Sequence, residues 1–291
     1  MEGRIVDVKR FAVHDGPGIR TTIFFKGCPL HCTWCHNPES ISPSPQLGFI
    51  PDKCIGCGEC RKVCPNERDT DKCVFCGKCA EACLGQALQF YGALRSSEEL
   101  IATVLEDKLF YQTSGGGMTL SGGEPLLQPE FARELLELAK ENGIHTAVDT
   151  CGYVGRRAFD MVKPLTDIFL YDLKHTDPAA HRKLTGCDNR LILENLRALD
   201  DDGCKIEVRI PLIPTLNDSE ENIRASGELL ASLKNLTLTR VLPYHDYARS
   251  KYRSLGMEDT MPHVELPDDE SLNRAVDILR SYGVNAKSGR E

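Results

Sequence analysis

Apolar residues change their spacing along the chain, and the change divides the sequence into three parts. Residues 20–27, RTTIFFKG, form a β-branched and aromatic run that predicts a buried strand ending at a glycine. A middle stretch contains little apolar periodicity and many cysteines, and after it helical spacing alternates with short apolar runs. We therefore expect residues 1–45 and 93–291 to form one domain, interrupted by an insert at 46–92.

The last segment predicts strands and helices in alternation. The expected helices are 96–112, behind a serine N-cap at 96 or 97, 128–143, 156–165, 189–203, 219–234 and 268–283. The expected strands after the insert are a short one within 115–125, then 144–150, 166–174, 204–213 and 235–244.

This alternation with short connections predicts an α/β fold whose parallel strands are flanked by helices. Six strands favour a partial (β/α)6 TIM-type barrel, and a doubly wound sheet is the alternative. Either fold places the chemistry at the carboxyl ends of the strands.

Composition and charge exclude several classes of protein. The 291 residues are 41% hydrophobic and 27% charged, which is ordinary for a globular protein. The formal charge of −8 offers no basic excess for nucleic acid. The sequence contains no apolar run of about 18 residues, so we expect no membrane span. Residues 1–11, MEGRIVDVKRF, lack the apolar core of a signal peptide, so we expect none. The expected location is the cytoplasm.

Cysteine content changes this ordinary picture. The chain has 14 cysteines, and 11 of them fall between Cys28 and Cys83. A secreted disulfide scaffold is typically shorter and carries an export signal. Clustered cysteines in a reducing compartment indicate metal binding instead.

Two cysteine runs in the insert share one spacing. Residues 54–65 and 73–84 each follow the pattern C-x2-C-x2-C-x3-C, as in bacterial ferredoxins, where the fourth cysteine of each run ligates the other 4Fe–4S cluster. One predicted ligand set is Cys54, Cys57, Cys60 and Cys83, and the second is Cys73, Cys76, Cys79 and Cys64. A pair of zinc knuckles is the alternative. The second run departs from the pattern at Leu84, where the first run has a proline.

A third group of cysteines has a different spacing. Cys28, Cys32 and Cys35 follow the expected strand 20–27 as C-x3-C-x2-C. Three thiolates hold three irons of a four-iron cluster and leave the fourth open, which is typical of a catalytic metal site. The single cysteines at 151, 187 and 204 are alternative fourth ligands, although lone intracellular cysteines are more often small buried hydrophobes.

The triplet, with Trp34 before its last cysteine, resembles the radical S-adenosylmethionine (SAM) enzymes. In that family the open iron chelates the amino and carboxylate groups of SAM. GGEP at residues 122–125 resembles the family motif that meets the SAM amino group, and its glycines allow close approach of the backbone.

A closer resemblance covers nearly the whole chain. Residues 14–38, HDGPGIRTTIFFKGCPLHCTWCHNP, are similar to the N-terminal signature of glycyl-radical-enzyme activating enzymes, which include the pyruvate formate-lyase activator. The same group is matched, in order, by VDT at 148–150, YDLKH at 171–175, VRIPLIPTLND at 208–218 and LPYH at 242–245.

The resemblance implies roles for individual residues. The residues expected to bind SAM are Trp34, Cys35, His36, Gly122, Gly123, Glu124, Asp149, Asp172, Leu173, Lys174, Arg209 and His245. Lys174 is expected to pair with the SAM carboxylate. Asp149, Thr150 and Asp172, with the Leu173 carbonyl, are expected to form an oxygen-rich site for a monovalent cation.

The resemblance also implies an activity, cofactors and partners. Three 4Fe–4S clusters and SAM are the expected cofactors, and a 5′-deoxyadenosyl radical abstracts hydrogen from a glycine of a partner enzyme. A flavodoxin or ferredoxin is the expected electron donor, and the chain is expected to be a monomer. One alternative is a radical SAM enzyme acting on a small molecule or peptide. The other is an electron-transfer module that performs no chemistry.

Overall fold

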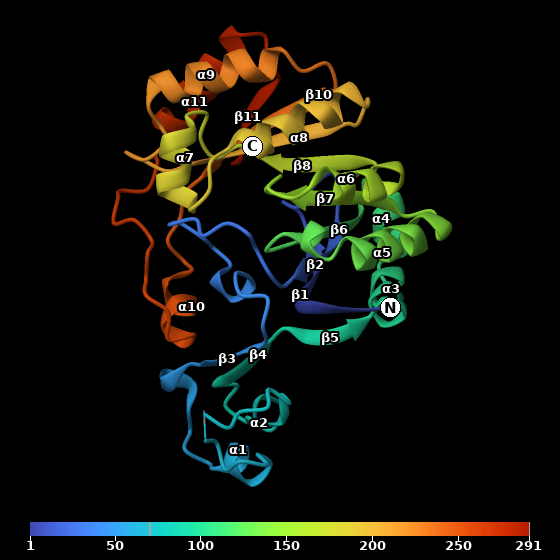
Figure 1. The fold of residues 1–291 in the computed structure, drawn as a ribbon, viewed down its shortest axis with the longest axis vertical. Helices are drawn as coiled ribbons and strands as arrows, with labels where there is room; N and C mark the ends of the chain where they lie inside the picture. Colours follow the sequence, from blue (N-terminus) through green and yellow to red (C-terminus); the bar gives the residue numbers. More distant parts are fainter. Residues whose placement is uncertain (70, 291) are drawn as a thin grey trace.

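A nine-stranded sheet organises the computed structural model, which describes residues 1–69 and 71–290 (Figure 1). The strands are β1 (Glu2–Ala12), β2 (Arg20–Phe25), β3 (Gln46–Phe49), β4 (Leu88–Tyr91), β5 (Ala93–Ser96), β6 (Gly117–Gly122), β7 (His145–Thr150), β8 (Ile168–Asp172), β9 (Ile206–Leu212), β10 (Leu236–Pro243) and β11 (Ala286–Ser288). The order across the large sheet is β11-β10-β9-β8-β7-β6-β2-β1-β5, and β3 pairs with β4 separately.

The strand order decides between the two predicted topologies. From β2 to β11 each strand lies parallel to the next one in the sheet, and no reversal of order interrupts the series. A doubly wound sheet requires such a reversal, so that alternative is wrong. The antiparallel strands β1 and β5 extend the sheet beyond β2, and β5 and β11 are its two edges.

Helices follow most of the strands. They are α1 (Glu59–Lys62), α2 (Lys78–Glu81), α3 (Ser97–Leu105), α4 (Lys108–Ser114), α5 (Pro129–Glu141), α6 (Arg156–Val162), α7 (Pro178–Thr185), α8 (Arg190–Asp201), α9 (Glu220–Ala231), α10 (Arg249–Ser254) and α11 (Asp269–Ser281). Within the described residues, none of them combines the length and the apolar composition needed to cross a bilayer. Buried side chains of the sheet and of α3, α5, α6, α8, α9 and α11 form one continuous core.

The predicted helix at 96–112 is two helices in the structure. The N-cap is Ser96, whose side chain accepts from the Glu99 N–H, as expected. The break falls at Asp107, whose buried carboxylate accepts hydrogen bonds from Arg10 (2.9 and 2.6 Å) and Thr21 (2.9 Å). Asp107 therefore links the helical segment to the strands β1 and β2 by hydrogen bonds, and the next helix, α4, begins at the following residue.

Outside the insert, two short helices were not predicted, and both lie beside the cysteine triplet. Helix α7 begins at Pro178 behind an Asp177 N-cap and ends at Gly186 in a left-handed conformation. Helix α10 has no side-chain cap. In Figure 1 the blue loop that follows β2 lies between yellow α7 and orange α10.

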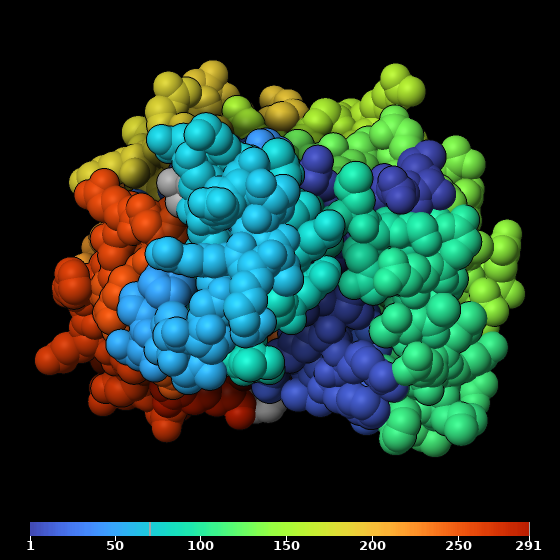
Figure 2. Space-filling view, turned by 90° about the horizontal axis from the view of Figure 1, so that it is seen from below, coloured from blue at the N-terminus to red at the C-terminus, as the bar shows by residue number. Residues whose placement is uncertain are grey.

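The insert is a small lobe attached through an antiparallel pair of strands. Strands β3 and β4 pair from Gln46↔Tyr91 to Phe49↔Leu88, so the insert leaves and rejoins the chain at one place. Inside it, Gly58 and Gly77 both adopt positive φ (76° and 77°), and each begins a four-residue helix. The sequence repeat is thus a structural repeat. Figure 2 shows the lobe, in light blue and cyan, beside the orange segment of α10.

We expect the core to respond strongly to loss of a buried leucine in the sheet. Leu120 on β6 is fully buried, so Leu120→Ala should lower the free energy of unfolding by about 2–5 kcal/mol. Leu109→Ala is the matched control, because Leu109 is 75% exposed and its truncation should cost no more than about 0.5 kcal/mol. Anaerobic urea unfolding followed by circular dichroism measures both. Equal losses in the two variants would contradict this description of the core.

Candidate functional site

The triplet loop, residues 28–37, begins three residues after β2 and is held on one side by the end of α7. The His31 N–H donates to the Thr185 carbonyl (2.8 Å), and the Thr33 N–H donates to the Leu184 carbonyl (3.0 Å). Both acceptors lie in the last turn of α7, where carbonyls lack partners within the helix. The loop therefore caps the helix, and the helix orders the loop.

Helix α10 holds the other side of the triplet loop. The Lys251 ammonium donates to the His36 carbonyl (3.0 Å) and to Glu39 Oε1 (2.5 Å). The Tyr252 hydroxyl donates to the Cys35 carbonyl (3.2 Å). Glu39 is only 6% exposed, and Lys251 is its salt-bridge partner. These contacts fix the backbone immediately after the last cysteine.

Trp34 anchors the loop through packing. Its ring is 4% exposed and belongs to a second hydrophobic cluster, separate from the main core. The other members of this cluster are Leu184, Ile213, Tyr244, Ala248, Tyr252 and Met261. The cluster joins α7, the ends of β9 and β10, and α10 around the loop. The contact of Trp34 with SAM stays a prediction, and its observed role is to anchor the loop.

The three cysteines are half-buried and lie near one cation, the ammonium of Lys174. Burial raises the pKa of Cys32 to about 12 and also raises the pKa of Cys35, while the nearby ammonium of Lys174 acts in the opposite direction on both. Burial alone would lower the pKa of Lys174, but Asp172 and Cys32 raise it, so the ammonium stays charged. Cluster assembly must therefore displace protons from the thiols, as iron–thiolate bonding does.

His36 forms an aromatic stack with His245, a residue that lies more than two hundred positions later in the chain, after β10. Its ring lies 3.9 Å from the ring of His245 at an angle of 11°, and its Nε2 lies 2.8 Å from the His245 carbonyl. Tyr247 stacks on the outer face of His245 at 4.6 Å. Burial lowers the pKa of His36 to about 4, so its ring is neutral at physiological pH. The structure thus brings together two predicted SAM contacts, His36 and His245.

The glycines of GGEP lie against the backbone that leads into the triplet. A Cβ at Gly122 would stand 2.3 Å from the Phe25 nitrogen, and one at Gly123 would stand 2.1 Å from the Gly27 carbonyl oxygen. Gly122 also has φ of 115°, which side chains rarely permit. Both glycines are therefore required for the close packing of β6 on β2.

Glu124 links three strand ends through hydrogen bonds. Its N–H donates to the Gly27 carbonyl (2.8 Å), next to the first cysteine of the triplet. Its carboxylate accepts from the Leu126 N–H (3.1 Å), the Thr150 hydroxyl (2.8 Å) and the Cys151 N–H (2.8 Å). The side chain is fully buried, and burial raises its pKa. Both oxygens already accept protein donors, and the predicted contact with SAM stays a prediction.

Asp149 and Arg209 form a buried ion pair between β7 and β9. Arg209 Nη1 lies 3.1 Å from Asp149 Oδ2, which also accepts from the Ser121 hydroxyl (2.7 Å). Arg209 Nη2 donates to the His14 carbonyl (2.6 Å). Burial alone would lower the pKa of Arg209, but Asp149 and Asp172 raise it, so the guanidinium stays charged.

Asp172 and Lys174 form the second ion pair at this edge, with 2.6 Å between Nζ and Oδ2. The predicted cation ligands Asp149, Thr150 and Asp172 thus each have a partner within the protein. No three His, Cys, Asp or Glu side chains of residues 1–69 and 71–290 surround a point that a single ion can occupy. The cation site therefore stays a prediction.

Two of the three single cysteines lie close to the triplet loop. The Cys151 side chain is buried, and its N–H donates to the carboxylate of Glu124 (2.8 Å), whose own N–H donates to the Gly27 carbonyl beside Cys28 (2.8 Å). The Cys187 thiol donates to the Pro29 carbonyl (3.7 Å). Cys204 packs against the main core instead. Cys151 is more than a hundred residues from the triplet in the sequence, which gave no reason to place it near the site. It directly follows a parallel strand, as the other site motifs do, and this position could have predicted its location.

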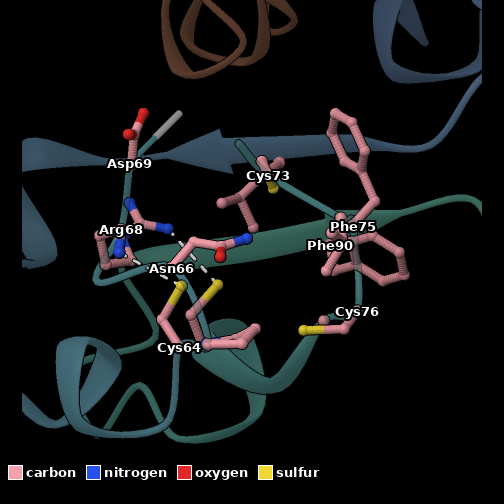
Figure 3. A pocket seen from close by; sticks show the side chains of 13 residues that line it. Cys64, Asn66, Arg68, Asp69, Cys73, Phe75, Cys76 and Phe90 are labelled. Carbon is pink, nitrogen blue, oxygen red and sulfur yellow. Dashed lines mark hydrogen bonds between the residues drawn. The ribbon is translucent and has the colours of Figure 1, made fainter. Parts of the chain in front are cut away.

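The insert contains a pocket that receives cysteines from both runs (Figure 3). Its lining includes Cys64 from the first run together with Cys73, Cys76 and Cys79 from the second. Arg68 donates from its backbone N–H to Cys64 Sγ (3.2 Å) and from its guanidinium to Cys79 Sγ (3.4 Å), which Figure 3 shows as dashed lines. Two of these four sulfurs accept N–H hydrogen bonds, and four thiolates are the usual ligands of a four-iron cluster.

The other four insert cysteines are Cys54, Cys57, Cys60 and Cys83, and all of them are exposed or half-buried. Cys54 and Cys57 are exposed, and Cys83 Sγ accepts from the Ala87 N–H (3.2 Å). The residues after Cys83 return to the first run, since a Cβ at Gly85 would stand 2.4 Å from the Lys53 carbonyl oxygen. This crossing arrangement fits the predicted exchange of the fourth ligand. Each thiolate of a cubane binds its own iron, so these sulfurs need not converge on one atom.

Comparison with known proteins adds independent evidence. Residues 22–226 match the family described as the radical SAM superfamily. The chain is 39% identical to the trans-4-hydroxy-L-proline dehydratase activating enzyme of Clostridioides difficile, covering 99% of this chain and 100% of that protein. It is also 39% identical to the choline trimethylamine-lyase activating enzyme of Oleidesulfovibrio alaskensis, covering 96% of this chain and 95% of that protein.

Solved structures similar to this chain include an activating enzyme of the same kind. A domain of the pyruvate-formate lyase-activating enzyme from Bacteroides vulgatus is 35% identical, with a TM-score of 0.52, covering 60% of this chain and 98% of that one. SuiB of Streptococcus suis bound to the precursor peptide SuiA is 12% identical, with a TM-score of 0.58, covering 90% of this chain and 46% of that one. The SuiB similarity concerns the fold alone.

Lys251 provides a test of the support that α10 gives to the loop. Lys251→Met should leave the Glu39 carboxylate buried without its cation and destabilise the loop by on the order of 1–3 kcal/mol. We expect faster loss of iron from the triplet when a chelator is added to the anaerobic protein. Adding Glu39→Gln to Lys251→Met removes the unpaired charge and should restore part of the retention. If the double variant loses iron faster than Lys251→Met, the ion pair is not the support described here.

Proposed function

The chain belongs to the radical SAM superfamily and, within it, to the glycyl-radical-enzyme activating enzymes, and we propose that it generates a glycyl radical on a large partner enzyme. A 4Fe–4S cluster with bound SAM supplies the 5′-deoxyadenosyl radical for this reaction. The residues of the chain bind and orient SAM, admit the glycine of the partner and exclude water.

One observation carries this proposal: polar side chains from five successive strand ends gather around a loop with three cysteines. They are Glu124 after β6, Asp149 and Thr150 on β7, Asp172 and Lys174 at β8, Arg209 on β9 and His245 after β10. Their contacts link neighbouring strands, as in the Asp149–Arg209 pair and the His36–His245 stack. An electron carrier that performs no chemistry has no use for such a set.

Charge supports a SAM position beside the triplet. SAM carries a carboxylate, an amino group and a sulfonium, and the buried cations Lys174 and Arg209 face the two aspartates at this edge. We infer that Lys174 exchanges Asp172 for the SAM carboxylate when SAM binds. The Oδ1 atoms of Asp149 and Asp172 form no hydrogen bond among the described residues, and they are the proposed ligands of a monovalent cation with Thr150 and the Leu173 carbonyl.

We infer that residues 46–92 form a ferredoxin-like module with two further clusters and that the barrel domain is a partial barrel. Support for the module is its structural repeat and the pocket that Cys64 shares with Cys73, Cys76 and Cys79. The proposed clusters relay electrons from a flavodoxin or ferredoxin to the triplet. Dense thiolate ligands favour a reducing compartment, and we propose the cytoplasm and a monomer that docks transiently.

The relatives bear on the identity of the partner. Named relatives of 35–41% identity activate enzymes that include a choline trimethylamine-lyase, a hydroxyproline dehydratase, an isethionate sulfite-lyase and an indoleacetate decarboxylase. These identities are nearly equal, so they do not select one partner enzyme for this chain. What the relatives have in common is that each is named as an activating enzyme. The partner class proposed here is therefore a glycyl radical enzyme. A small-molecule or peptide substrate is the rival.

SAM binding and glycyl radical formation test this proposal in sequence. SAM added to the reduced, anaerobic protein should change the electron paramagnetic resonance (EPR) signal of one cluster, because SAM occupies the open iron. With a glycyl radical enzyme present, a stable protein radical should then accumulate on that partner. An unchanged cluster signal would exclude radical SAM chemistry. Modification of a small molecule, with no radical on any member of a panel of glycyl radical enzymes, would favour the rival.

The insert clusters are tested by removing one ligand. Three four-iron clusters give about twelve irons per chain, and Cys57→Ala should lose about four of them. If the insert relays electrons, Cys57→Ala should leave the SAM-dependent signal intact while activation driven by flavodoxin or ferredoxin slows at least tenfold. Cys204→Ala, in the main core, is the control. Loss of the folded protein in Cys57→Ala alone would identify the cluster as structural.

A further inference from the structure

A buried lysine joins the triplet loop to the insert. Lys26 directly follows β2, two positions before Cys28, and is only 2% exposed. Its Nζ donates to the Glu39 carbonyl (2.6 Å) and to Oε1 of Gln46 (2.8 Å), the first residue of β3. The cluster and SAM roles described above leave this side chain unused.

The end of the insert meets the same side chain. A Cβ at Gly92 would stand 2.5 Å from Lys26 Cδ, so the aliphatic part of the lysine lies against the residue where the insert ends. The Gly92 N–H donates to the Ile5 carbonyl (3.2 Å), and its carbonyl accepts from Arg4 Nη1 (3.1 Å). The beginning and the end of the insert are thus both held at Lys26.

The β3–β4 ladder leads from this contact into the insert, and Figure 1 shows the two strands between the large sheet and the helices α1 and α2. Gln46 faces Tyr91 at the first position of the ladder. The next pair, Leu47 and Phe90, lines the pocket that receives cysteines from both runs. The cysteines of this four-cysteine pocket are Cys64, Cys73, Cys76 and Cys79.

The second predicted ligand set lies farther along the ladder. Cys83 Sγ accepts from the Ala87 N–H (3.2 Å), and the Ala87 carbonyl accepts from the Ile50 N–H (2.8 Å). Ile50 lies three residues beyond Leu47, which is about 10 Å along an extended chain. The four-cysteine pocket is therefore nearer to Lys26 than Cys83 is.

We propose that Lys26 is a positioning residue for electron delivery, which holds the near end of the β3–β4 ladder, and with it the four-cysteine pocket, beside the triplet loop. The proposal rests on the function proposed above, in which a reduced flavodoxin or ferredoxin gives up one electron and is itself oxidised. One electron moves through the insert to the triplet, and no bond is made or broken.

The geometry also gives the two ligand sets an order. Between Leu47 in the pocket wall and Cys28 in the triplet, the connection consists of covalent bonds and one hydrogen bond, from Lys26 to Gln46. The set in the four-cysteine pocket is therefore the inner one, which delivers the electron to the triplet. The outer set, which receives the electron from the external donor, consists of Cys54, Cys57, Cys60 and Cys83.

The contact is tested with Gln46→Met, which removes the acceptor and leaves the hydrogen bond from Lys26 to the Glu39 carbonyl in place. Hydrogen-exchange protection of the Gly92 amide should fall about tenfold, because a hydrogen bond that holds the insert is lost. Reduction of the triplet cluster by reduced flavodoxin, followed by EPR in the full chain without partner enzyme, should slow severalfold. Reduction by dithionite should match the wild type, since this small reductant reaches the triplet without the insert.

Two variants control for a general effect of substitution in the ladder. Gln46→Glu keeps an acceptor oxygen for Lys26 and should retain the wild-type rate with flavodoxin. Gln89→Met changes a glutamine on β4 whose oxygen accepts from Tyr91 within the insert, and it should also match the wild type. A rate in either control as slow as that of Gln46→Met would overturn the role of the Lys26 contact.

The order of the ligand sets is tested by EPR of the fully reduced protein. Magnetic coupling between neighbouring reduced clusters broadens their signals, so the SAM-sensitive signal of the wild type should be broadened. The broadening should disappear in Cys76→Ala and persist in Cys57→Ala. The opposite pattern overturns the order, and absence of broadening in the wild type overturns it even if the variants do not fold.

Further outcomes separate this proposal from a purely structural role and from the proposed function. Equal slowing with flavodoxin and with dithionite in Gln46→Met would overturn the proposal, because a disturbed triplet loop alone has that result. An unchanged flavodoxin rate despite lost protection at Gly92 would also overturn it. A wild type without any SAM-sensitive cluster would instead contradict the proposed function.

Discussion

The buried carboxylate of Glu124 is the interaction on which the geometry of the site depends. It is fully buried, and it remains in the interior because N–H and O–H groups from two strand ends donate to it. Through its own N–H it also fixes Gly27, from which the triplet loop starts. The origin of the loop, the end of β6 and the end of β7 are therefore positioned by one residue, and any displacement of one end leaves buried donors unsatisfied.

Near Glu124, the aspartates of the site each form an ion pair with a cation of the protein. Asp149 pairs with Arg209, and Asp172 pairs with Lys174, so two half-buried carboxylates each meet a buried cation. Buried pairs of this kind add little to stability, because desolvation offsets most of the attraction between the charges. Their value here lies in orientation. A ligand that carries both signs of charge, as SAM does, can offer its carboxylate to these cations and its amino group and sulfonium to these carboxylates.

Sequence patterns predicted the parts of the fold that repeat and missed those that depend on packing. The strands β2 and β6–β10 and the helices α5, α8, α9 and α11 follow apolar periodicity, and the structure confirms them. Helices α7 and α10 are too short to show a period, although Asp177, Pro178 and Gly186 mark the ends of α7. Contacts between distant residues, such as Asp149 with Arg209 or Glu124 with Cys151, follow from the topology of the sheet. The spacing of residues along the chain does not predict such contacts.

The attachment of the insert has an evolutionary consequence. Gln46 and Tyr91 face each other across the β3–β4 ladder, so the two ends of the lobe stand side by side. A chain without the intervening residues needs only a tight turn to continue from Pro45 to Gly92, whose φ of 93° already suits such a turn. The lobe is therefore a module that a lineage can gain, lose or exchange in one genetic event. The nine-stranded sheet, with the triplet loop and α10, stays intact through such an exchange.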